Sequence, residues 1–325
     1  MRSGTALLAD IGGTNTRFAL LDKEGRIGAP TVFPTAAHET LEAAIQHWMD
    51  ETGHRPDAAA LAVAGPVTGD VVALTNHPWR ISASGLAARF GFAPVCVMND
   101  VAAIARALPD LPDSAFRPLK PGTANPEAAR LVVAPGTGLG VAALLPAKTG
   151  FHVASSEGGH VTLAARDAAE AALLERLRED GAHLSAEDVL AAPGLARLHH
   201  AFSGKSIEPE EVTAAALAGE ANARAATAAY CAMLGGVAGD LAMAFDARGG
   251  VVIAGDLPGR MGNTFDMNSF IRRFTDKGPF AAYLAAIPVS LLDAPYPAFA
   301  GLAALLRDQP LDDQPQSDQP KRPVT

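Results

Sequence analysis

The chain has 325 residues, of which 49% are hydrophobic and 19% charged, with a net charge of −9. This length exceeds most single cores and predicts two domains. Because no Lys/Arg cluster could neutralise the phosphates of a nucleic acid, and no uncharged apolar run approaches the roughly 18 residues of a membrane span, we expect neither partner and favour a small molecule or a protein.

The opening stretch 7–21 reads LLADIGGTNTRFALL and predicts two strands joined by a tight turn. Paired glycines let backbone N–H groups approach a ligand without a Cβ in the way. The turn is therefore a candidate phosphate cradle, in which Thr14 and Asn15 add donors and Asp10 is placed to hold a hydrated cation. An ordinary glycine hairpin with a surface aspartate is the alternative.

Strands then alternate with helices, which predicts an α/β fold. Apolar residues at helical spacing predict a helix from residue 41 that stops at Gly53, and further helices are expected over 82–91 and 101–108. Strands are expected over 58–64, 71–75 and 95–98. Asn99 and Asp100 follow the last of these strands, at the carboxyl end where ligands bind in such sheets.

Residues 109–129 contain five prolines, so we place the interdomain hinge near here, between a small domain over 1–110 and a large domain over 111–297. Beyond the hinge, strand 131–134, the turn PGTGLG at 135–140 and strand 141–145 repeat the pattern of the opening stretch. Two facing hairpins could hold one polyphosphate from both sides.

The remaining elements are expected in the following order. Asp167 caps a helix that ends at Gly181, and Ser185 caps another. Pro209 suits the first turn of a further helix, and a long helical stretch over 221–245 is interrupted by glycines at 235, 236 and 239. A strand over 251–254, a helix over 270–274, a strand over 289–292 and a helix over 299–306 follow, and the Gln/Pro/Asp-rich tail 308–325 is expected to be disordered.

Two common nucleotide signatures do not fit the glycine clusters. The GxGxG spacing at 136–140 runs into an apolar β-rich segment, whereas a Rossmann fingerprint needs GxGxxG opening a helix. The sequence Gly204-Lys205-Ser206 would need glycine at His199 to form a P-loop. Cys96 and Cys231 lie in separate apolar segments, which predicts reduced thiols, and the N-terminus lacks a signal peptide, so we expect a cytoplasmic protein.

Five motifs occur in order along nearly the whole chain: ADIGGTN (9–15), ND (99–100), APGTGLG (134–140), SEGGH (156–160) and SAEDVLAAPGL (185–195). Together they resemble the bacterial ATP-dependent glucokinase family. The resemblance implies a two-domain actin-like fold of the ribonuclease-H type, with ATP and glucose in the cleft between the domains. It also implies that the C-terminal helix, 298–307, completes the small domain, and it suggests a homodimer.

The resemblance assigns roles residue by residue. Asp100 would be the base that accepts the proton of the glucose 6-hydroxyl. The residues that match sugar-binding positions are Asn99, Asp100, Glu157, His160 and Glu187. The residues that match ATP-binding positions are Asp10, Ile11, Gly12, Gly13, Thr14, Asn15, Gly136, Thr137, Gly138 and Gly255. Mg²⁺ would be held near Asp10 through water.

Each assignment has a structural alternative. Asp100 could be a helix N-cap, Glu187 an acid that complements a helix dipole, and His160 a buried, satisfied histidine. The chain also departs from the family, because Asp256 replaces a second glycine after Gly255, and residue 240 is Asp where Asn is commoner. We expect Gly255 and a Gly235-Gly236 turn to border the adenine.

Two other functions are compatible with these motifs. One is a kinase for another hexose or amino sugar. The other is a non-catalytic sugar sensor on the same scaffold. Such regulators usually carry a DNA-binding module before the first hairpin, and only nine residues precede Asp10 here. The zinc-type cysteine cluster of the related repressor and sugar-kinase family is absent from the sequence, which favours the zinc-free glucokinases.

Overall fold

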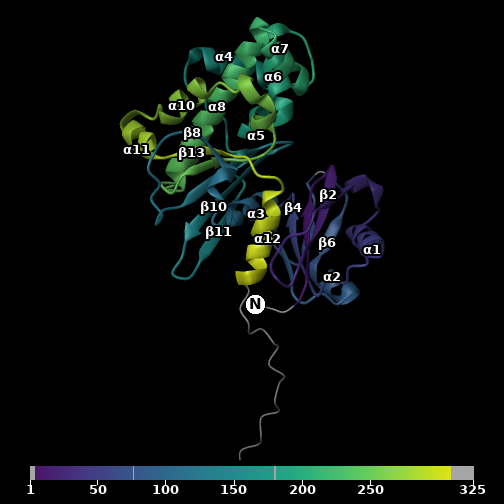
Figure 1. The fold of residues 1–325 in the computed structure, drawn as a ribbon. Coiled ribbons are helices and arrows are strands. Elements are labelled where there is room, and N and C mark those ends of the chain that lie inside the picture. The colour runs from purple at the N-terminus through teal and green to yellow at the C-terminus, as the bar shows by residue number, and fades with distance from the viewer. Residues whose placement is uncertain (1–3, 76, 179–180, 309–325) are drawn as a thin grey trace, which may run out of the picture.

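The computed structural model describes residues 4–75, 77–178 and 181–308, and its ribbon divides into two lobes (Figure 1). The predicted disordered tail lies outside these residues, except that Asp308 ends the last helix. One lobe contains a five-stranded sheet in the order β3-β2-β1-β4-β7, and the other a six-stranded sheet in the order β11-β10-β9-β12-β13-β8. The predicted α/β fold class is therefore confirmed.

The first lobe holds the elements up to β7. They are β1 (Ala6–Ile11), β2 (Asn15–Leu21), β3 (Thr31–Pro34), η1 (Thr35–Ala37), α1 (Leu41–Thr52), β4 (Ala58–Val63), β5 (Val71–Ala73), β6 (Arg80–Ser82), α2 (Ala83–Phe90) and β7 (Val95–Asn99). β1 pairs antiparallel with β2 and parallel with β4, so the predicted opening hairpin is present. Ser82 caps α2 and Gly91 ends it with a positive φ, as the sequence predicted.

Both faces of this sheet are covered, which is why β4 is buried along its whole length. Side chains alternate across a strand, so Leu7 and Ile11 of β1 pack with Trp48 of α1, while Leu8 packs on the other face with Leu302 of the C-terminal helix. That the C-terminal helix completes the small domain stays a prediction, as does the domain boundary at residue 110.

The second lobe holds the later elements. They are η2 (Asp113–Ala115), β8 (Phe116–Lys120), β9 (Arg130–Pro135), β10 (Leu139–Pro146), β11 (Phe151–Ser156), η3 (Gly158–His160), α4 (Ala168–Leu177), α5 (Ala186–Leu190), α6 (Ala192–Ser203), α7 (Pro209–Leu217), α8 (Ala221–Ala244), β12 (Val251–Ile253), α9 (Leu257–Met261), η4 (Gly262–Thr264), α10 (Met267–Thr275), η5 (Gly278–Phe280), α11 (Ala281–Ala286) and β13 (Val289–Leu292). β9 pairs antiparallel with β10, which confirms the second predicted hairpin. α4 ends at Leu177, four residues before the predicted stop at Gly181.

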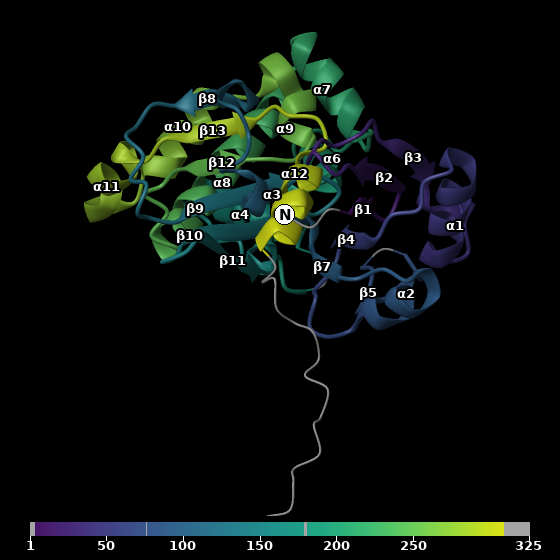
Figure 2. The same cartoon turned by 60° about the horizontal axis from the view of Figure 1, so that its bottom comes forward.

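Two helices, α3 (Asp100–Ala107) and α12 (Pro297–Asp308), lie side by side between the sheets (Figures 1 and 2). They approach at backbone distance, since a Cβ on Gly301 would lie 1.8 Å from the Ala103 carbonyl oxygen. An ion pair between Arg106 Nε and Asp308 Oδ2, at 2.7 Å, joins them again near the end of the chain. Because α3 also packs on Val132 of the large sheet, this helix pair connects the two lobes.

The glycines of α8 correct one prediction. The sequence suggested that Gly235, Gly236 and Gly239 interrupt the helix and form a turn beside the adenine, but α8 continues through all three. A Cβ on Gly235 would lie 2.2 Å from the Phe270 carbonyl oxygen, so this glycine is needed where α10 packs against α8. Of the described helices, α8 alone is long and apolar enough for a membrane span, and 72% of its apolar window is buried, as in a core helix.

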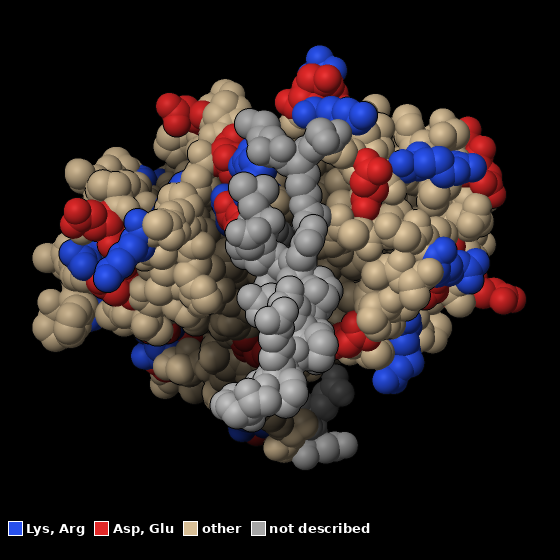
Figure 3. All heavy atoms as spheres, turned by 90° about the horizontal axis from the view of Figure 1, so that it is seen from below, with Lys and Arg blue, Asp and Glu red and all other residues tan. Residues whose placement is uncertain are grey.

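Charged side chains are dispersed on the face that Figure 3 shows. Outside the area that the grey residues cover, Lys and Arg lie among Asp and Glu, and no basic area is concentrated on this view (Figure 3). Ion pairs occur elsewhere among the described residues too, for example between Arg26 and Asp22 at 2.7 Å. This face therefore lacks the electrostatic pattern of a nucleic-acid surface.

Candidate functional site

The first hairpin turn presents backbone amides that have no partner. The turn closes through a hydrogen bond from the Gly12 N–H to the Asn15 carbonyl at 3.0 Å. Among the described residues, the N–H groups of Gly13 and Thr14 donate to no acceptor. A Cβ on Gly12 would lie 3.2 Å from the Asn15 oxygen, so a larger residue would crowd the turn. Unpaired amides in a glycine turn can bind an anion, so the phosphate cradle stays a prediction that this geometry permits.

The second hairpin turn repeats this arrangement. It closes through a hydrogen bond from the Gly136 N–H to the Gly138 carbonyl at 2.8 Å. The N–H of Ala192, the first residue of α6, donates to the Gly136 carbonyl at 2.8 Å and fixes that peptide. In the described chain, the N–H groups of Thr137 and Gly138 have no acceptor. Each hairpin therefore carries two amides that have no acceptor among the described residues.

Glu187 lies against the second hairpin. Its Oε2 accepts the Leu139 N–H at 2.7 Å, and a Cβ on Gly138 would lie 2.7 Å from the same oxygen. Its Oε1 lies 3.9 Å from His160 Nδ1, and His160 Nε2 lies 3.9 Å from Glu157 Oε2. Three residues predicted to bind sugar thus form a row next to a predicted phosphate turn.

His160 lies beside Glu187 because Gly159, the residue before it, lets η3 pack closely against β10. A Cβ on Gly159 would lie 1.9 Å from the Leu139 carbonyl oxygen, so η3 packs directly on the first residue of β10. The side chains of Glu157 and His160 are 68% and 57% exposed. The alternative that His160 is a buried, satisfied histidine is therefore wrong, and both side chains are accessible to a ligand.

Asn99 and Asp100 occupy the junction of β7 and α3. Asn99 is the N-cap of α3, because its Oδ1 accepts the N–H groups of Val101 and Ala102 at 2.9 and 3.1 Å. Its Nδ2 donates to the Gly65 carbonyl at 3.4 Å. The N-cap alternative for Asp100 is thus wrong, since its neighbour takes that role and leaves Asp100 as the first residue of the helix.

The protein environment raises the pKa of Asp100 to about 6. The main cause is that surrounding atoms displace water from the carboxylate, and the negative charge of Asp10 adds to the effect. The Val101 N–H, which donates to Asp100 Oδ1 at 2.8 Å, opposes the shift. Asp10 and Asp100 therefore lie close enough to influence each other, which connects the first hairpin with α3.

The structure adds Arg17 to the site, a residue that the sequence reasoning missed. Arg17 Nη1 lies 3.0 Å from Asp10 Oδ2, and its guanidinium lies over the ring of Tyr296 at 5.9 Å. Desolvation raises the pKa of Asp10, and Arg17 opposes this shift. Asp10 and Arg17 are cross-strand partners in the β1–β2 register, so the hairpin alone contained the signal.

Gly255 lies behind the second hairpin. Its φ is +82°, and a Cβ there would lie 2.4 Å from the Pro135 carbonyl oxygen, so only glycine fits this position. Asp256 Oδ1 lies 3.5 Å from the place of a Cβ on Gly136. Asp256 Oδ2 lies 3.2 Å from Arg260 Nη2, and this ion pair offsets the negative charge of the carboxylate near the second turn.

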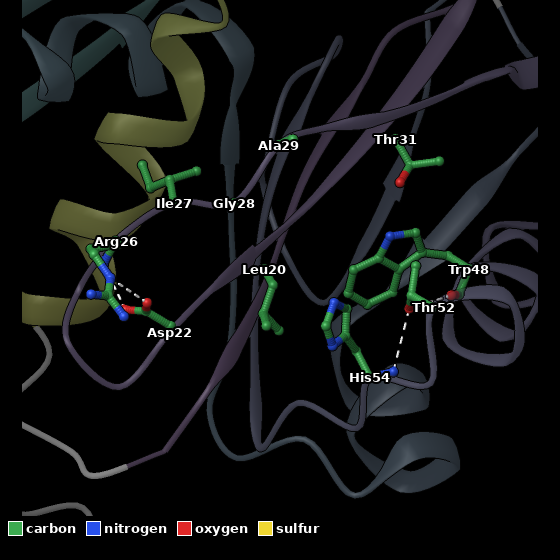
Figure 4. A pocket seen from close by; sticks show the side chains of 10 residues that line it. All are labelled: Leu20, Asp22, Arg26, Ile27, Gly28, Ala29, Thr31, Trp48, Thr52 and His54. Atoms are coloured by element: carbon green, nitrogen blue, oxygen red, sulfur yellow. Dashed lines mark hydrogen bonds and ion pairs between the residues drawn. The ribbon is translucent and has the colours of Figure 1, made fainter.

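The predicted residues therefore gather in two groups. Glu157, His160, Glu187 and Gly255 adjoin the second hairpin, as does α3, since a Cβ on Gly140 would overlap Val101. The first hairpin lies in the other lobe and is linked to Asp100 through the charge of Asp10. A separate cavity of about 440 Å³ lies beneath the loop that joins β2 to β3, beside the end of α1 (Figure 4). None of the predicted site residues lines it.

The raised pKa of Asp100 predicts a pH-dependent cost to folding. The pKa is about 6 in the folded chain, whereas an ordinary aspartate has a pKa of about 3.9. The folded state therefore binds the proton more tightly than the unfolded chain and loses this advantage as pH rises through 6. Two pKa units correspond to about 3 kcal/mol in total, of which roughly half is lost between pH 5 and pH 8. Asp100→Asn should therefore gain unfolding free energy relative to wild type between pH 5 and pH 8. Thermal unfolding at both pH values measures it, and an unchanged difference would contradict the burial of this charge.

The chain matches the family model described as Glucokinase over residues 7–309. The glucokinase of Cupriavidus metallidurans is 38% identical over 313 residues, which is 93% of each chain. The bifunctional protein glk of Paraburkholderia xenovorans is 38% identical over 94% of this chain but only 49% of its own length. The chain therefore spans about half the length of several curated relatives that it matches.

Solved structures agree with this assignment. A glucokinase from an Antarctic psychrotroph superposes with a TM-score of 0.84 at 36% identity, covering 94% of this chain and 99% of that one. The glucokinase of Balamuthia mandrillaris, solved in complex with glucose, gives a TM-score of 0.80 at 26% identity and covers 93% of each chain. With the family model, the relatives and the two-hairpin site in agreement, this chain belongs to the glucokinase family.

Proposed function

We propose that this chain is an ATP-dependent hexose kinase, a glucokinase, that transfers the γ-phosphoryl group of ATP to the 6-hydroxyl of glucose. The products are glucose 6-phosphate and ADP. The observation that carries this proposal is the pair of glycine turns with unpaired amides, together with a carboxyl of pKa about 6 at the start of the helix between the sheets. A kinase for another hexose would use the same parts.

The amides supply the contacts that phosphoryl transfer needs. The reaction has little covalent chemistry for a protein to perform, so catalysis consists mostly of positioning and of neutralising charge. The N–H groups of Gly13 and Thr14 in one lobe, and of Thr137 and Gly138 in the other, would donate to phosphate oxygens from two sides. These amides are fixed before the ligand arrives, so they do not have to be reorganised.

Asp100 would accept the proton of the attacking hydroxyl. A general base is most effective when its pKa lies near the working pH, because it must be ionised and still bind the proton. A pKa of about 6 meets both needs at neutral pH, whereas an ordinary aspartate is a weaker base. Its position at the start of α3, next to the sugar-binding candidate Asn99, supports this role.

The row of Glu157, His160 and Glu187 would bind the sugar hydroxyls. A hexose hydroxyl both donates and accepts, and carboxylate and imidazole groups can pair with either function. Glu187 already accepts the Leu139 N–H through one oxygen, so its other oxygen can face the sugar while the first keeps the side chain in place. The glucose held by the Balamuthia mandrillaris enzyme supports glucose as the substrate.

We infer that Mg²⁺ enters with ATP. Mg²⁺ prefers oxygen ligands and is usually held by one or two carboxylates together with substrate phosphates and water. The charge of Asp10 raises the pKa of Asp100, so the two carboxylates lie near each other and offer such oxygens. No cluster of three or more His, Cys, Asp or Glu ligands occurs among the described residues. Asp10 would hold the ion through water, and the ion would neutralise phosphate charge.

The two cysteines bear on the cellular location of the protein. We propose a cytoplasmic enzyme, because Cys96 and Cys231 are both buried, and burial raises the pKa of Cys231 to about 12, which makes it unreactive. Neither nucleic acid nor membrane is among the proposed partners. A homodimer remains a proposal based on the family resemblance.

The rate should depend on the ionisation of Asp100. Because a protonated carboxyl cannot accept the hydroxyl proton, kcat/KM for glucose should fall below pH 6, about tenfold for each unit, and level off above pH 7. This parameter reports the free enzyme, to which the pKa of about 6 applies. Initial rates between pH 5 and 8 at constant ionic strength measure the profile. A flat profile down to pH 5 would exclude a base with this pKa.

A substrate panel tests the proposed function. ATP, MgCl₂ and the protein are combined with glucose, mannose, fructose, glucosamine or N-acetylglucosamine, and ADP formation is followed by a coupled assay. We expect glucose to give the highest kcat/KM and ³¹P NMR to detect glucose 6-phosphate. A higher value for another sugar would support the related-kinase alternative, and no sugar-dependent ADP formation would support a non-catalytic sensor.

A further inference from the structure

Thr35 lies against the first hairpin and makes three polar contacts with it. Its N–H donates to the Thr14 carbonyl at 2.9 Å, and its hydroxyl donates to the Gly12 carbonyl at 2.8 Å. The Thr35 and Thr16 hydroxyls are 3.0 Å apart. Thr35 and Thr16 are both fully buried, so these groups have little access to solvent. A single residue thus holds both ends of the glycine turn, the Thr14 end through its backbone N–H and the Gly12 end through its hydroxyl.

These contacts determine where the turn's amides point. In a trans peptide unit the C=O and the N–H point in opposite directions. A hydrogen bond that draws the Gly12 carbonyl toward Thr35 therefore turns the Gly13 N–H away from Thr35. The bond to the Thr14 carbonyl does the same for the Asn15 N–H. The Gly13 N–H, which has no acceptor among the described residues, thus points away from the buried threonine.

We propose that Thr35 is a positioning residue for the nucleotide phosphates, acting through the peptide units of the first hairpin. This inference rests on the proposed function, because it concerns how the same site receives ATP. The second hairpin has a counterpart: the Ala192 N–H binds the Gly136 carbonyl and thereby turns the Thr137 N–H away from α6. At the first hairpin the corresponding carbonyl, that of Gly12, accepts from a side chain, the Thr35 hydroxyl.

The segment around Thr35 is itself held from several sides. The proline ring fixes the φ of Pro34 at −58°. β3 pairs with β2 as far as Pro34, directly before Thr35 donates to the Thr14 carbonyl. Beyond η1, the indole N–H of Trp79 donates to the His38 carbonyl at 3.2 Å. Phe33 packs at 6.0 Å from Phe18 in the core of this lobe. These contacts therefore fix the position of the backbone that carries the Thr35 hydroxyl.

Thr35→Val tests the proposal because valine keeps the shape and the backbone N–H but removes the hydroxyl. The Gly12 carbonyl and the Thr16 hydroxyl then lose their buried partner. We expect KM for ATP, and the Kd of its analogue AMPPNP with MgCl₂, to rise about tenfold, as the loss of one such bond predicts. KM for glucose should change less than twofold. Amide exchange of a peptide spanning residues 12–16 should become faster in the ligand-free protein.

Two further variants separate positioning from general stability. Thr35→Ser keeps the hydroxyl and should restore KM for ATP and slow exchange. Thr227→Val removes an equally buried hydroxyl that donates to the Arg224 carbonyl within α8, at 3.0 Å, far from the hairpin in sequence. Thr227→Val should lower thermal stability without changing KM for ATP. Equal effects of both valine variants, or equal shifts in KM for ATP and glucose, would overturn the proposal.

The readouts also distinguish this proposal from the proposed function. If wild type phosphorylates glucose and Thr35→Val binds AMPPNP with unchanged Kd and unchanged exchange at residues 12–16, the role of Thr35 is wrong and the glucokinase proposal stands. If wild type phosphorylates no sugar, the proposed function fails. AMPPNP binding and amide exchange then still decide whether Thr35 orients the hairpin.

Discussion

Asp100→Asn should lower kcat for glucose phosphorylation by roughly 10²- to 10⁴-fold, the usual contribution of a general base. Asparagine has the same shape but cannot accept a proton, so the loss reports proton transfer rather than packing. The Kd for glucose, measured by calorimetry, should stay within a few-fold of wild type, because the amide can still hydrogen-bond to the hydroxyl. The variant should also be more stable above pH 7, which rules out misfolding as the cause.

Asp113→Asn serves as the matched control. Asp113 is an exposed aspartate in η2, thirteen residues along the chain, and it has no part in the site. Its replacement should leave kcat and the glucose Kd unchanged. If Asp100→Asn keeps more than about a tenth of wild-type kcat, Asp100 is not the base, because losses from general bases start near 10²-fold.

Glu187→Ala should lower kcat/KM for glucose by about 100-fold. The variant loses a charged hydrogen bond to the sugar, worth about 1.5–3 kcal/mol, and leaves the Leu139 N–H without its acceptor at 2.7 Å. Most of the effect should appear in KM for glucose, since Glu187 would bind the sugar before and during the reaction. KM for ATP should rise less. Initial rates with each substrate varied in turn measure this split.

Asp188→Ala separates sugar binding from the stability of α5. Asp188 is the neighbour of Glu187 and forms a capping box with Ser185, where its Oδ2 accepts the Ser185 N–H at 2.7 Å. Its loss should destabilise the helix by about 1 kcal/mol. KM for glucose should rise much less than in Glu187→Ala. Similar KM values in both variants would mean that Glu187 acts only through the fold of α5.

The hairpins and the capped helices could be predicted because their signals are local. Gly12 and Gly136 stand in turns between short apolar runs, and Ser82 and Ser185 cap helices that begin at the next residue. Such patterns need only a few neighbouring residues, and the structure contains all four features. β8 was missed because Pro118 weakens its strand signal, although proline is tolerated there on an edge strand.

Other features depend on contacts between distant segments. The sequence predicts a break in α8 at Gly235, but the helix continues through this residue. Glycine is needed there because the backbone at Phe270 of α10 packs directly against it. The sequence of α8 contains no signal for this contact with α10. Thr35 was missed for the same reason, since its partners lie 19 or more residues earlier and meet it only through the β2–β3 register.

The candidate site likewise combines features that the sequence predicts with features that depend on the fold. Glu157, His160 and Glu187 were proposed from the family resemblance, and their proximity to the second hairpin agrees with that proposal. The pKa of Asp100 could not be predicted from the sequence, because it depends on the atoms that exclude water and on the charge of Asp10. Ion pairing of Asp10 with Arg17 follows from the hairpin register, yet the sequence alone does not tell which face of the hairpin is buried.

A crystal structure of this protein with AMPPNP, Mg²⁺ and glucose tests the central claim most directly. We predict that the amides of Gly13 and Thr14 and those of Thr137 and Gly138 lie within hydrogen-bond distance of phosphate oxygens. The Asp100 carboxylate should lie about 2.6–3.2 Å from the glucose 6-hydroxyl, as a general base requires. Phosphates bound away from either turn, or a 6-hydroxyl facing another group than Asp100, would contradict the account.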